Sequence, residues 1–192
     1  MQELPEFALQ ALLPIARDNV GRALRGEPVE VPALAAETEA ALHIRRATFV
    51  TLMHGERLRG CLGRFEPRYE LKEEVAWQAR ESATCDSRFH TDPVKLSELP
   101  ALKIEISVLS PLHEIQSLDE IQLGVHGIVV DDRRGRRGVY LPQVAVEHRM
   151  TLEQFLTSCC RHKAGLPGDA WRNPGQVAIE IFSAQVAMER TL

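Results

Sequence analysis

Two hydrophobic periods follow one another along this chain, and each requires a different backbone geometry. Between residues 5 and 25, apolar side chains recur at every third or fourth position, at Leu9, Leu12, Ala16, Val20 and Leu24. That spacing places them on one face of an α-helix. Residues 101–110 instead alternate apolar and polar side chains, which is the period of a β-strand with one buried face. The chain therefore predicts both helices and half-buried strands.

The remaining segments follow the same two patterns. Further helical segments are predicted at 32–43, 70–83 and 151–162. Hairpins are predicted for 47–63 and 121–141, and two short strands for 177–189. Because strands and helices do not alternate regularly, we expect an α+β fold with antiparallel pairing. The hairpin 47–63, the strand 101–110 and the closing pair would form one antiparallel sheet of about five strands flanked by helices.

The composition is that of a globular protein. The chain has 192 residues, of which 44% are hydrophobic and 26% charged, and this fits one domain. No apolar run approaches the roughly 18 residues of a membrane helix, and the first residues do not have the pattern of a signal peptide. Four cysteines without a CxxC pair do not suggest a secreted disulfide framework. We therefore expect a cytoplasmic protein that does not contact a membrane.

Charge is distributed unevenly, although the net charge is only −4. Residues 45–64 hold five basic side chains and one acidic one, and residues 133–172 hold eight basic and three acidic ones. If the fold brought these stretches together, they would attract an anion. The net acidic charge argues against a protein whose whole surface binds nucleic acid.

The segment LRGCLG at 58–63 is the most informative motif. In a regular strand Arg59 and Cys61 project from one face, and a guanidinium beside a thiol favours the reactive thiolate. Gly60 and Gly63 leave the backbone bare, so that a ligand can approach or the strand can bulge. The alternative is a small buried cysteine in a glycine-bent strand, without chemistry. We take Cys61 as a candidate catalytic residue, and Arg59, Gly60 and Gly63 as candidate ligand-binding residues.

A second group of candidates lies in the loop CDSRF and in the strand that follows it. Asp86 and Arg88 are candidate ligand-binding residues that would pair with each other, or Asp86 would accept hydrogen bonds within its own turn. The alternative is a plain connector between helix and strand. Glu105, which we also take as a candidate catalytic residue, lies on the polar face of its strand, where a covered carboxylate needs a partner such as Arg59 or Arg88.

Two further candidates lie beyond residue 120. His126 stands between glycines in LGVHG, and histidine is a residue type suited to act as an acid or base near neutral pH, although such a residue also commonly caps a bend. Gln143 supplies a side-chain amide after a rigid Leu-Pro pair. Cys159 and Cys160 do not have metal-ligand spacing, and the chain has no P-loop, GxGxxG, HExxH, GxSxG or EF-hand motif. We expect no metal site, and no cofactor is indicated.

Six segments, taken in order, resemble one protein family. They are LRGCLG at 58–63, CDSRF at 85–89, EISVLSPL at 105–112, LGVHGIVV at 123–130, GVYLPQVAVE at 138–147 and KAGLPGDAW at 163–171. This series resembles the AMMECR-one domain family, known in prokaryotes as AmmeMemoRadiSam system protein A, over nearly the whole chain. The family more commonly has Ile at the position of Leu62 and Pro at that of Ser87, and both changes are mild.

The resemblance implies an α+β fold with a larger lobe built from both chain ends, a smaller lobe, and motif residues gathered in the cleft between them. We assign residues 1–112 and 148–192 to the large lobe, and the hairpin-bearing residues 113–147 to the small one. The histidine and the glutamine of the small lobe would then face Cys61.

The resemblance implies no particular reaction. The name of the system implies association with a Memo-type protein, similar to non-haem dioxygenases, and with a radical S-adenosylmethionine protein in a modification pathway. Our first hypothesis is a thiol-dependent enzyme or group carrier centred on Cys61. Arg59 would lower the thiol pKa, Arg88 would hold an anionic substrate group, Glu105 would orient an arginine and His126 would act as acid or base. The alternative is a non-catalytic binding or adaptor module, and RNA binding is a weaker one.

Overall fold

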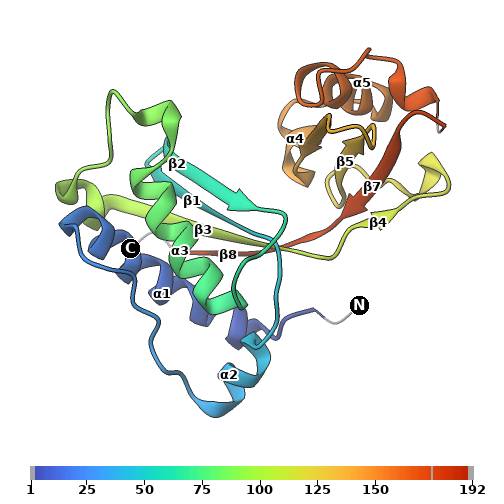
Figure 1. Ribbon diagram of the computed structural model, residues 1–192. Helices are drawn as coiled ribbons and strands as arrows, with labels where there is room; N and C mark the ends of the chain where they lie inside the picture. Colours follow the sequence, from blue (N-terminus) through green and yellow to red (C-terminus); the bar gives the residue numbers. More distant parts are fainter. Residues whose placement is uncertain (1–2, 174, 190–192) are drawn as a thin grey trace. The chain divides into compact units, whose positions relative to one another are not determined.

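The chain folds into two compact units, each built around its own four-stranded sheet. The structure is a computed structural model that describes residues 3–173 and 175–189. The first unit comprises Met1–Leu109 with Gln185–Leu192, and the second comprises Ser110–Ala184. The strand orders are β2-β1-β3-β8 and β4-β7-β5-β6 (Figure 1). The expected α+β class is confirmed, but two four-stranded sheets replace the single sheet of about five strands.

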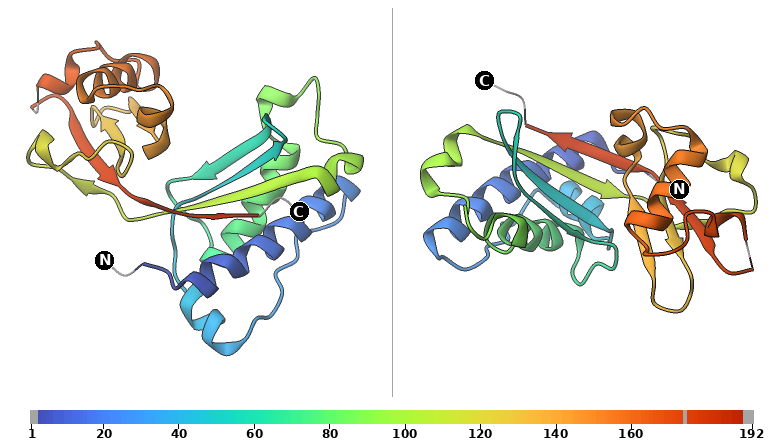
Figure 2. Two further views of the ribbon diagram at one scale, coloured as in Figure 1. Left: turned by 180° about the vertical axis from the view of Figure 1, so that it is seen from behind. Right: turned by 90° about the horizontal axis from the view of Figure 1, so that it is seen from above.

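The first unit packs helices against one face of its sheet. Its elements are α1 (Glu6–Arg25), α2 (Ala36–Leu42), β1 (Thr48–His54), β2 (Arg57–Arg64), α3 (Leu71–Thr84), β3 (Leu102–Leu109) and β8 (Ala184–Met188), with 3-10 helices at Ser87–Phe89 and Leu96–Ala101. Figures 1 and 2 show α1 and α3 on the same side of the sheet. Val50, Leu52, Ile104 and Ile106 are fully buried in the core that these helices cover. The alternating residues of β1 and β3 therefore face away from the helices.

The second unit packs α5 against its sheet. Its elements are β4 (His113–Glu114), β5 (Gly127–Asp131), β6 (Arg137–Tyr140), α4 (Pro142–Glu147), α5 (Leu152–His162) and β7 (Ala178–Phe182), with 3-10 helices at Leu118–Glu120 and Ala170–Arg172. Thr151 caps α5 as its sequence suggests, because its side chain accepts a hydrogen bond from the Gln154 amide. Phe155 and Leu156 are buried in one core with Ile128. Residues 148–184, expected in the large lobe, thus belong to the second unit.

The two closing strands explain why the expected strand count differs. They are β7 and β8, and the break falls at Ser183 as the sequence indicates. However, β7 joins β4 and β5 in the second unit, whereas β8 lies beside β3 in the first. Two consecutive strands thus belong to different sheets, a long-range arrangement that the local pattern does not contain.

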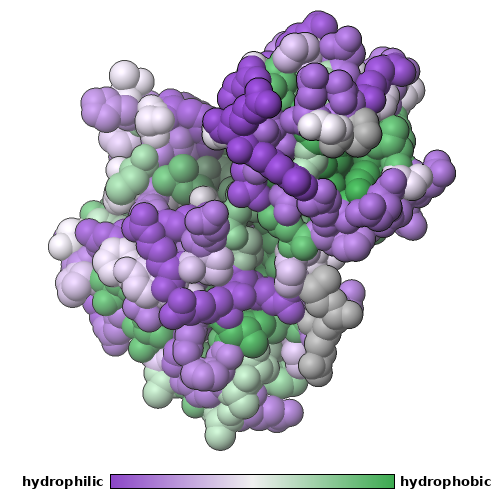
Figure 3. Space-filling model, turned by 45° about the vertical axis from the view of Figure 1, so that its right-hand side comes forward, coloured by the Kyte–Doolittle hydropathy of each residue, from purple (hydrophilic) through white to green (hydrophobic). Residues whose placement is uncertain are grey.

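On the face drawn in Figure 3, hydrophilic residues predominate and hydrophobic ones occupy smaller areas. Among the described residues, no helix is both long enough and apolar enough to cross a membrane.

Replacing Ile106 by alanine is expected to destabilise the protein strongly. The side chain is fully buried at the centre of the apolar face of β3, so Ile106→Ala removes packed methyl groups and leaves a cavity. We expect a loss of about 2 to 5 kcal/mol in the free energy of unfolding, measured by denaturant titration. Lys103→Ala, on the opposite face of the same strand, is the control. A loss below about 1 kcal/mol for Ile106→Ala would contradict the assigned facing of β3.

Candidate functional site

A row of three side chains crosses the open face of the first sheet. Thr51 on β1 pairs with Cys61 on β2 and, on its other side, with Glu105 on β3. Because side chains alternate along a strand, this row lies opposite the buried Val50 and Leu52. The sheet thus places two of the three candidate catalytic residues, Cys61 and Glu105, on one face with a threonine between them.

The backbone of Cys61 is held from the outer edge of the sheet by two other candidates. β2 is an edge strand, so its outward backbone groups have no neighbouring strand to pair with. The Cys61 amide donates to Asp86 Oδ2 at 2.9 Å, and Arg88 Nη2 donates to the Cys61 carbonyl oxygen at 2.9 Å. Arg88 also binds both carboxylate oxygens of Asp86, with Nε to Oδ1 at 2.9 Å and Nη2 to Oδ2 at 2.6 Å. Asp86, Arg88 and Cys61 are therefore brought into direct contact.

The hydrogen bonds between Asp86 and Arg88 favour the charged forms of both side chains. Hydrogen bonds from Arg88 hold the pKa of the Asp86 carboxyl below its usual range, against the opposing effect of burial. Asp86 raises the pKa of the Arg88 guanidinium, and the Cys61 side chain adds to this increase. The Asp86 side chain is only 4% exposed, whereas that of Arg88 is 54% exposed. Arg88 is therefore a cation in direct contact with Cys61, and part of its side chain remains open to solvent.

Thr51 is a site residue that our sequence reasoning missed. Its hydroxyl donates a hydrogen bond to Cys61 Sγ at 3.2 Å. Near the turn of the hairpin, His54 pairs with Arg57. If this register continued along the strands, Val50 would lie opposite Cys61. The observed partner is Thr51 because the register shifts by one residue between Leu52 and Met53. The sequence signal for this shift is Gly60, which permits a bulge but does not fix its position.

Arg59 is the extra residue of that bulge. Leu52 pairs with Gly60 and Met53 with Leu58, so Arg59 has no partner on β1, and the regular alternation that placed it beside Cys61 does not hold. The Arg59 side chain is only 2% exposed.

The guanidinium of Arg59 is bound to other groups. It donates to both oxygens of Glu98, at 2.7 and 2.9 Å, and to the Pro93 carbonyl at 3.0 Å. The hydrogen bonds from Arg59 lower the pKa of Glu98 to about 2. Arg59 thus anchors β2 to the segment before β3.

The two glycines of the motif are required by packing. A Cβ on Gly60 would lie 2.0 Å from the carbonyl oxygen of Ser82 in α3, and one on Gly63 would lie 2.3 Å from the ring of Phe49. The Ser82 hydroxyl also accepts from the Leu62 amide and donates to the carbonyl of Val50. The space that these glycines leave is therefore filled by protein atoms.

His126 and Gln143 lie in the second unit. His126 Nδ1 is 3.0 Å from the Glu120 carbonyl oxygen and 3.2 Å from the Gln122 amide, so the ring is held by its own loop, as the capping alternative expects. Gln143 is exposed on α4. That either residue faces Cys61 stays a prediction.

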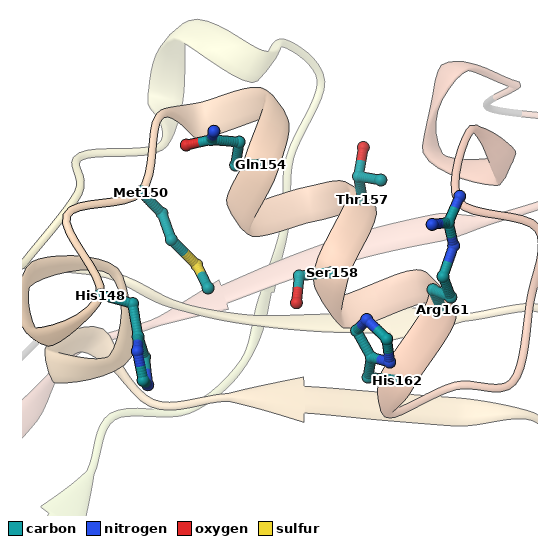
Figure 4. A pocket seen from close by; sticks show the side chains of 7 residues that line it. All are labelled: His148, Met150, Gln154, Thr157, Ser158, Arg161 and His162. Atoms are coloured by element: carbon teal, nitrogen blue, oxygen red, sulfur yellow. The ribbon is translucent and has the colours of Figure 1, made fainter.

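One cavity of the first unit is lined by candidate site residues, whereas a cavity of the second unit is not. One of about 240 Å³ adjoins the site and is lined by residues of β2, α3 and the CDSRF loop, including Arg59, Asp86 and Phe89. A cavity of about 350 Å³ in the second unit is lined by His148, Met150, Gln154, Thr157, Ser158, Arg161 and His162. In Figure 4, Thr157 and Arg161 point to one side of α5 and Ser158 to the other, so these polar groups do not converge.

The four cysteines fall into two classes. Cys159 and Cys160 are buried, and burial raises the pKa of both thiols, that of Cys159 to about 12. Cys85 is exposed and Cys61 is partly so. The described part of the chain contains no group of three or more His, Cys, Asp or Glu that could hold a metal ion.

Many of the basic residues have acidic partners. Arginines in ion pairs within the two basic stretches are Arg57, Arg59, Arg64, Arg133, Arg136, Arg137 and Arg172. These pairs compensate much of the positive charge locally, which weakens the case for a nucleic-acid surface.

The fold and the site together define an α+β protein of two units that presents a cysteine on an edge strand, held by an aspartate-arginine pair. A family model matches residues 13–187, and the chain belongs to the AMMECR1 family.

Two relatives and one solved structure illustrate this membership. The chain is 34% identical to protein NEQ441 of Nanoarchaeum equitans over 186 residues, which covers 93% of this chain and 98% of that protein. It is 37% identical to a protein of Methanothermobacter thermautotrophicus, covering 94% and 93%. The crystal structure of the uncharacterized protein PH0010 from Pyrococcus horikoshii matches with a TM-score of 0.85 at 31% identity, covering 98% of both chains. The resemblance drawn from the six motifs is thereby confirmed.

Loss of the Glu98 carboxylate is expected to destabilise the protein in a pH-dependent way. The folded pKa of about 2 lies below the ordinary 4.5, so Glu98 contributes stability above pH 4.5 that is lost as the pH falls towards 2. Glu98→Gln should therefore cost on the order of 2 kcal/mol at pH 7, and the difference from wild type should shrink between pH 4.5 and 2. The measurement is urea unfolding at several pH values, with the exposed Glu66→Gln as control. A difference that stays constant across this range would show that the ion pair does not act in this way.

Proposed function

We propose that the protein is a thiol-dependent enzyme or group carrier in which Cys61 is the nucleophile. The observation that carries this proposal is the contact of Arg88 and Asp86 with the backbone of Cys61. A cation close to a thiol favours the thiolate, and the thiolate is the form that attacks electrophiles. Arg88, rather than Arg59, has the role of lowering the thiol pKa.

The proposed ligand is anionic. Arg88 binds Asp86 and Cys61, and its side chain is more than half exposed, so the exposed part of the guanidinium can also bind a carboxylate or phosphate group. Such a group on Arg88 would bring the ligand next to the sulfur. Asp86 orients the arginine, and Glu105 lies on the same open face as the thiol. His126 as acid or base and Gln143 as a ligand-binding residue complete the proposal.

The pathway and the location are proposed from the family resemblance. Association with a Memo-type protein and a radical S-adenosylmethionine protein would make this protein one member of a modification pathway. A reducing cytoplasm would keep the accessible thiols of Cys61 and Cys85 free.

A binding or adaptor module is the second candidate, and an exposed apolar group favours it. Leu123, Val125 and Val146 are 37%, 51% and 62% exposed in the second unit. A Cβ on Gly124 would lie 2.8 Å from the Val146 side chain, so the loop that holds the first two touches α4. Two family motifs, LGVHG and LPQVAV, supply these residues. An apolar group of this kind is typical of a surface that contacts a partner.

The nucleophile is tested by the pH dependence of alkylation of Cys61. Trypsin releases Cys61 in residues 60–64 and Cys85 in residues 81–88, so mass spectrometry measures each thiol separately after treatment with iodoacetamide. We expect a pKa for Cys61 below the roughly 8.5 of a free cysteine. Arg88→Gln should raise it by about one unit or more, since the neighbouring positive charge is removed. Cys159 and Cys160 should label only in denaturant.

The control for this experiment is Arg57→Gln, which removes an exposed arginine from the same strand. It should leave the pKa of Cys61 unchanged. If Cys61 stays unlabelled at pH 9 in the folded protein but labels readily in denaturant, the nucleophile is refuted and the adaptor is favoured. An ordinary pKa that Arg88→Gln does not change would also refute the proposal.

A further inference from the structure

The hydroxyl of Thr51 is directed at the sulfur of Cys61 on the open face of the first sheet. The distance from Oγ1 to Sγ is 3.2 Å, and the hydroxyl is the donor. The contact follows from the register, which places the two residues directly opposite each other on β1 and β2. Thr51 lies outside the six family motifs and had no role in the sequence hypotheses.

The type of pairing brings these two side chains close. The amide and carbonyl of Cys61 point outwards, to Asp86 and Arg88, so Cys61 and Thr51 form a pair without mutual backbone hydrogen bonds. In antiparallel sheets such pairs have the shorter separation, about 4.5 Å between Cα atoms. The register that turns the Cys61 backbone outwards therefore also brings the hydroxyl close to the sulfur.

We infer that Thr51 is a positioning residue that stabilises the Cys61 thiolate through this hydrogen bond. A thiolate accepts a hydrogen bond more strongly than a thiol, so a fixed donor favours the charged form and lowers the pKa. The hydroxyl also occupies a lone pair of the sulfur on the side of β1, which leaves the other lone pairs for an electrophile on the open face. This inference rests on the proposed thiol function and assigns it a second source of activation, independent of Arg88.

The test compares a substitution that removes the hydroxyl of Thr51 with one that keeps it. Thr51→Val keeps the size and the β-branched shape but removes the hydroxyl, and Thr51→Ser keeps the hydroxyl. We expect Thr51→Val to raise the pKa of Cys61 by about 0.5 to 1 unit, which is a three- to tenfold loss of thiolate near pH 7. Thr51→Ser should restore a value near that of wild type. The readout is the alkylation rate of residues 60–64 against pH, with Cys85 in the same sample as internal control.

The outcomes separate this inference from the proposed function. If Cys61 has a low pKa that Arg88→Gln raises but Thr51→Val leaves unchanged, the role of Thr51 is refuted and the proposed function stands. If Thr51→Val and Thr51→Ser shift the pKa equally, packing rather than the hydroxyl is responsible, and the inference is also refuted. If wild-type Cys61 has an ordinary pKa and Thr51→Val still raises it, the hydrogen bond is supported and the nucleophile is not. Thr51→Ala is a second variant without a hydroxyl and must agree with Thr51→Val.

Discussion

A single extra residue in β2 determines what the site contains. The hairpin starts from the turn in one register and continues, past Arg59, in a register shifted by one residue. Because the side-chain period of a strand is two, a shift of one residue moves every later side chain to the other face. Without the bulge, Cys61 would lie opposite Val50 and enter the core beneath α3. With it, Cys61 lies on the open face beside Thr51, while Arg59 binds Glu98.

Packing of α3 depends on the same stretch of strand. The first residue after the bulge is Gly60, and the missing Cβ admits the Ser82 carbonyl to a position that any side chain would block. The Ser82 hydroxyl then links the two strands at Leu62 and Val50. A helix is thus fixed to the strand immediately before and after Cys61. The CDSRF loop follows directly from the end of α3, so this contact also places Asp86 at the outer edge of β2.

Local sequence patterns predicted the helices and strands well, but they predicted less well which distant strands pair with each other. The helical period gave α1 within a residue, and the alternation gave the buried face of β3 and the break between β7 and β8. The pairing of Asp86 with Arg88 was one of the alternatives that loop chemistry offered. The position of Arg59 could not be predicted, because a bulge is decided by what packs on the strand. The unit to which α5 belongs depends on which sheet buries its apolar face, and that too is a contact between distant segments.

The electrostatics of the site make it sensitive to its geometry. Asp86 is an anion close to Cys61, and its negative charge alone would oppose a thiolate. Its oxygens are occupied by the Cys61 amide and by Arg88, so the pair of Asp86 and Arg88 is neutral overall and has the field of a dipole. The field of a dipole falls off faster with distance than that of a single charge, so in the proposed function Arg88 would act on the sulfur only while β2 keeps its position. The packing of α3 on Gly60 would then matter to the proposed chemistry of the thiol as well as to the stability of the fold.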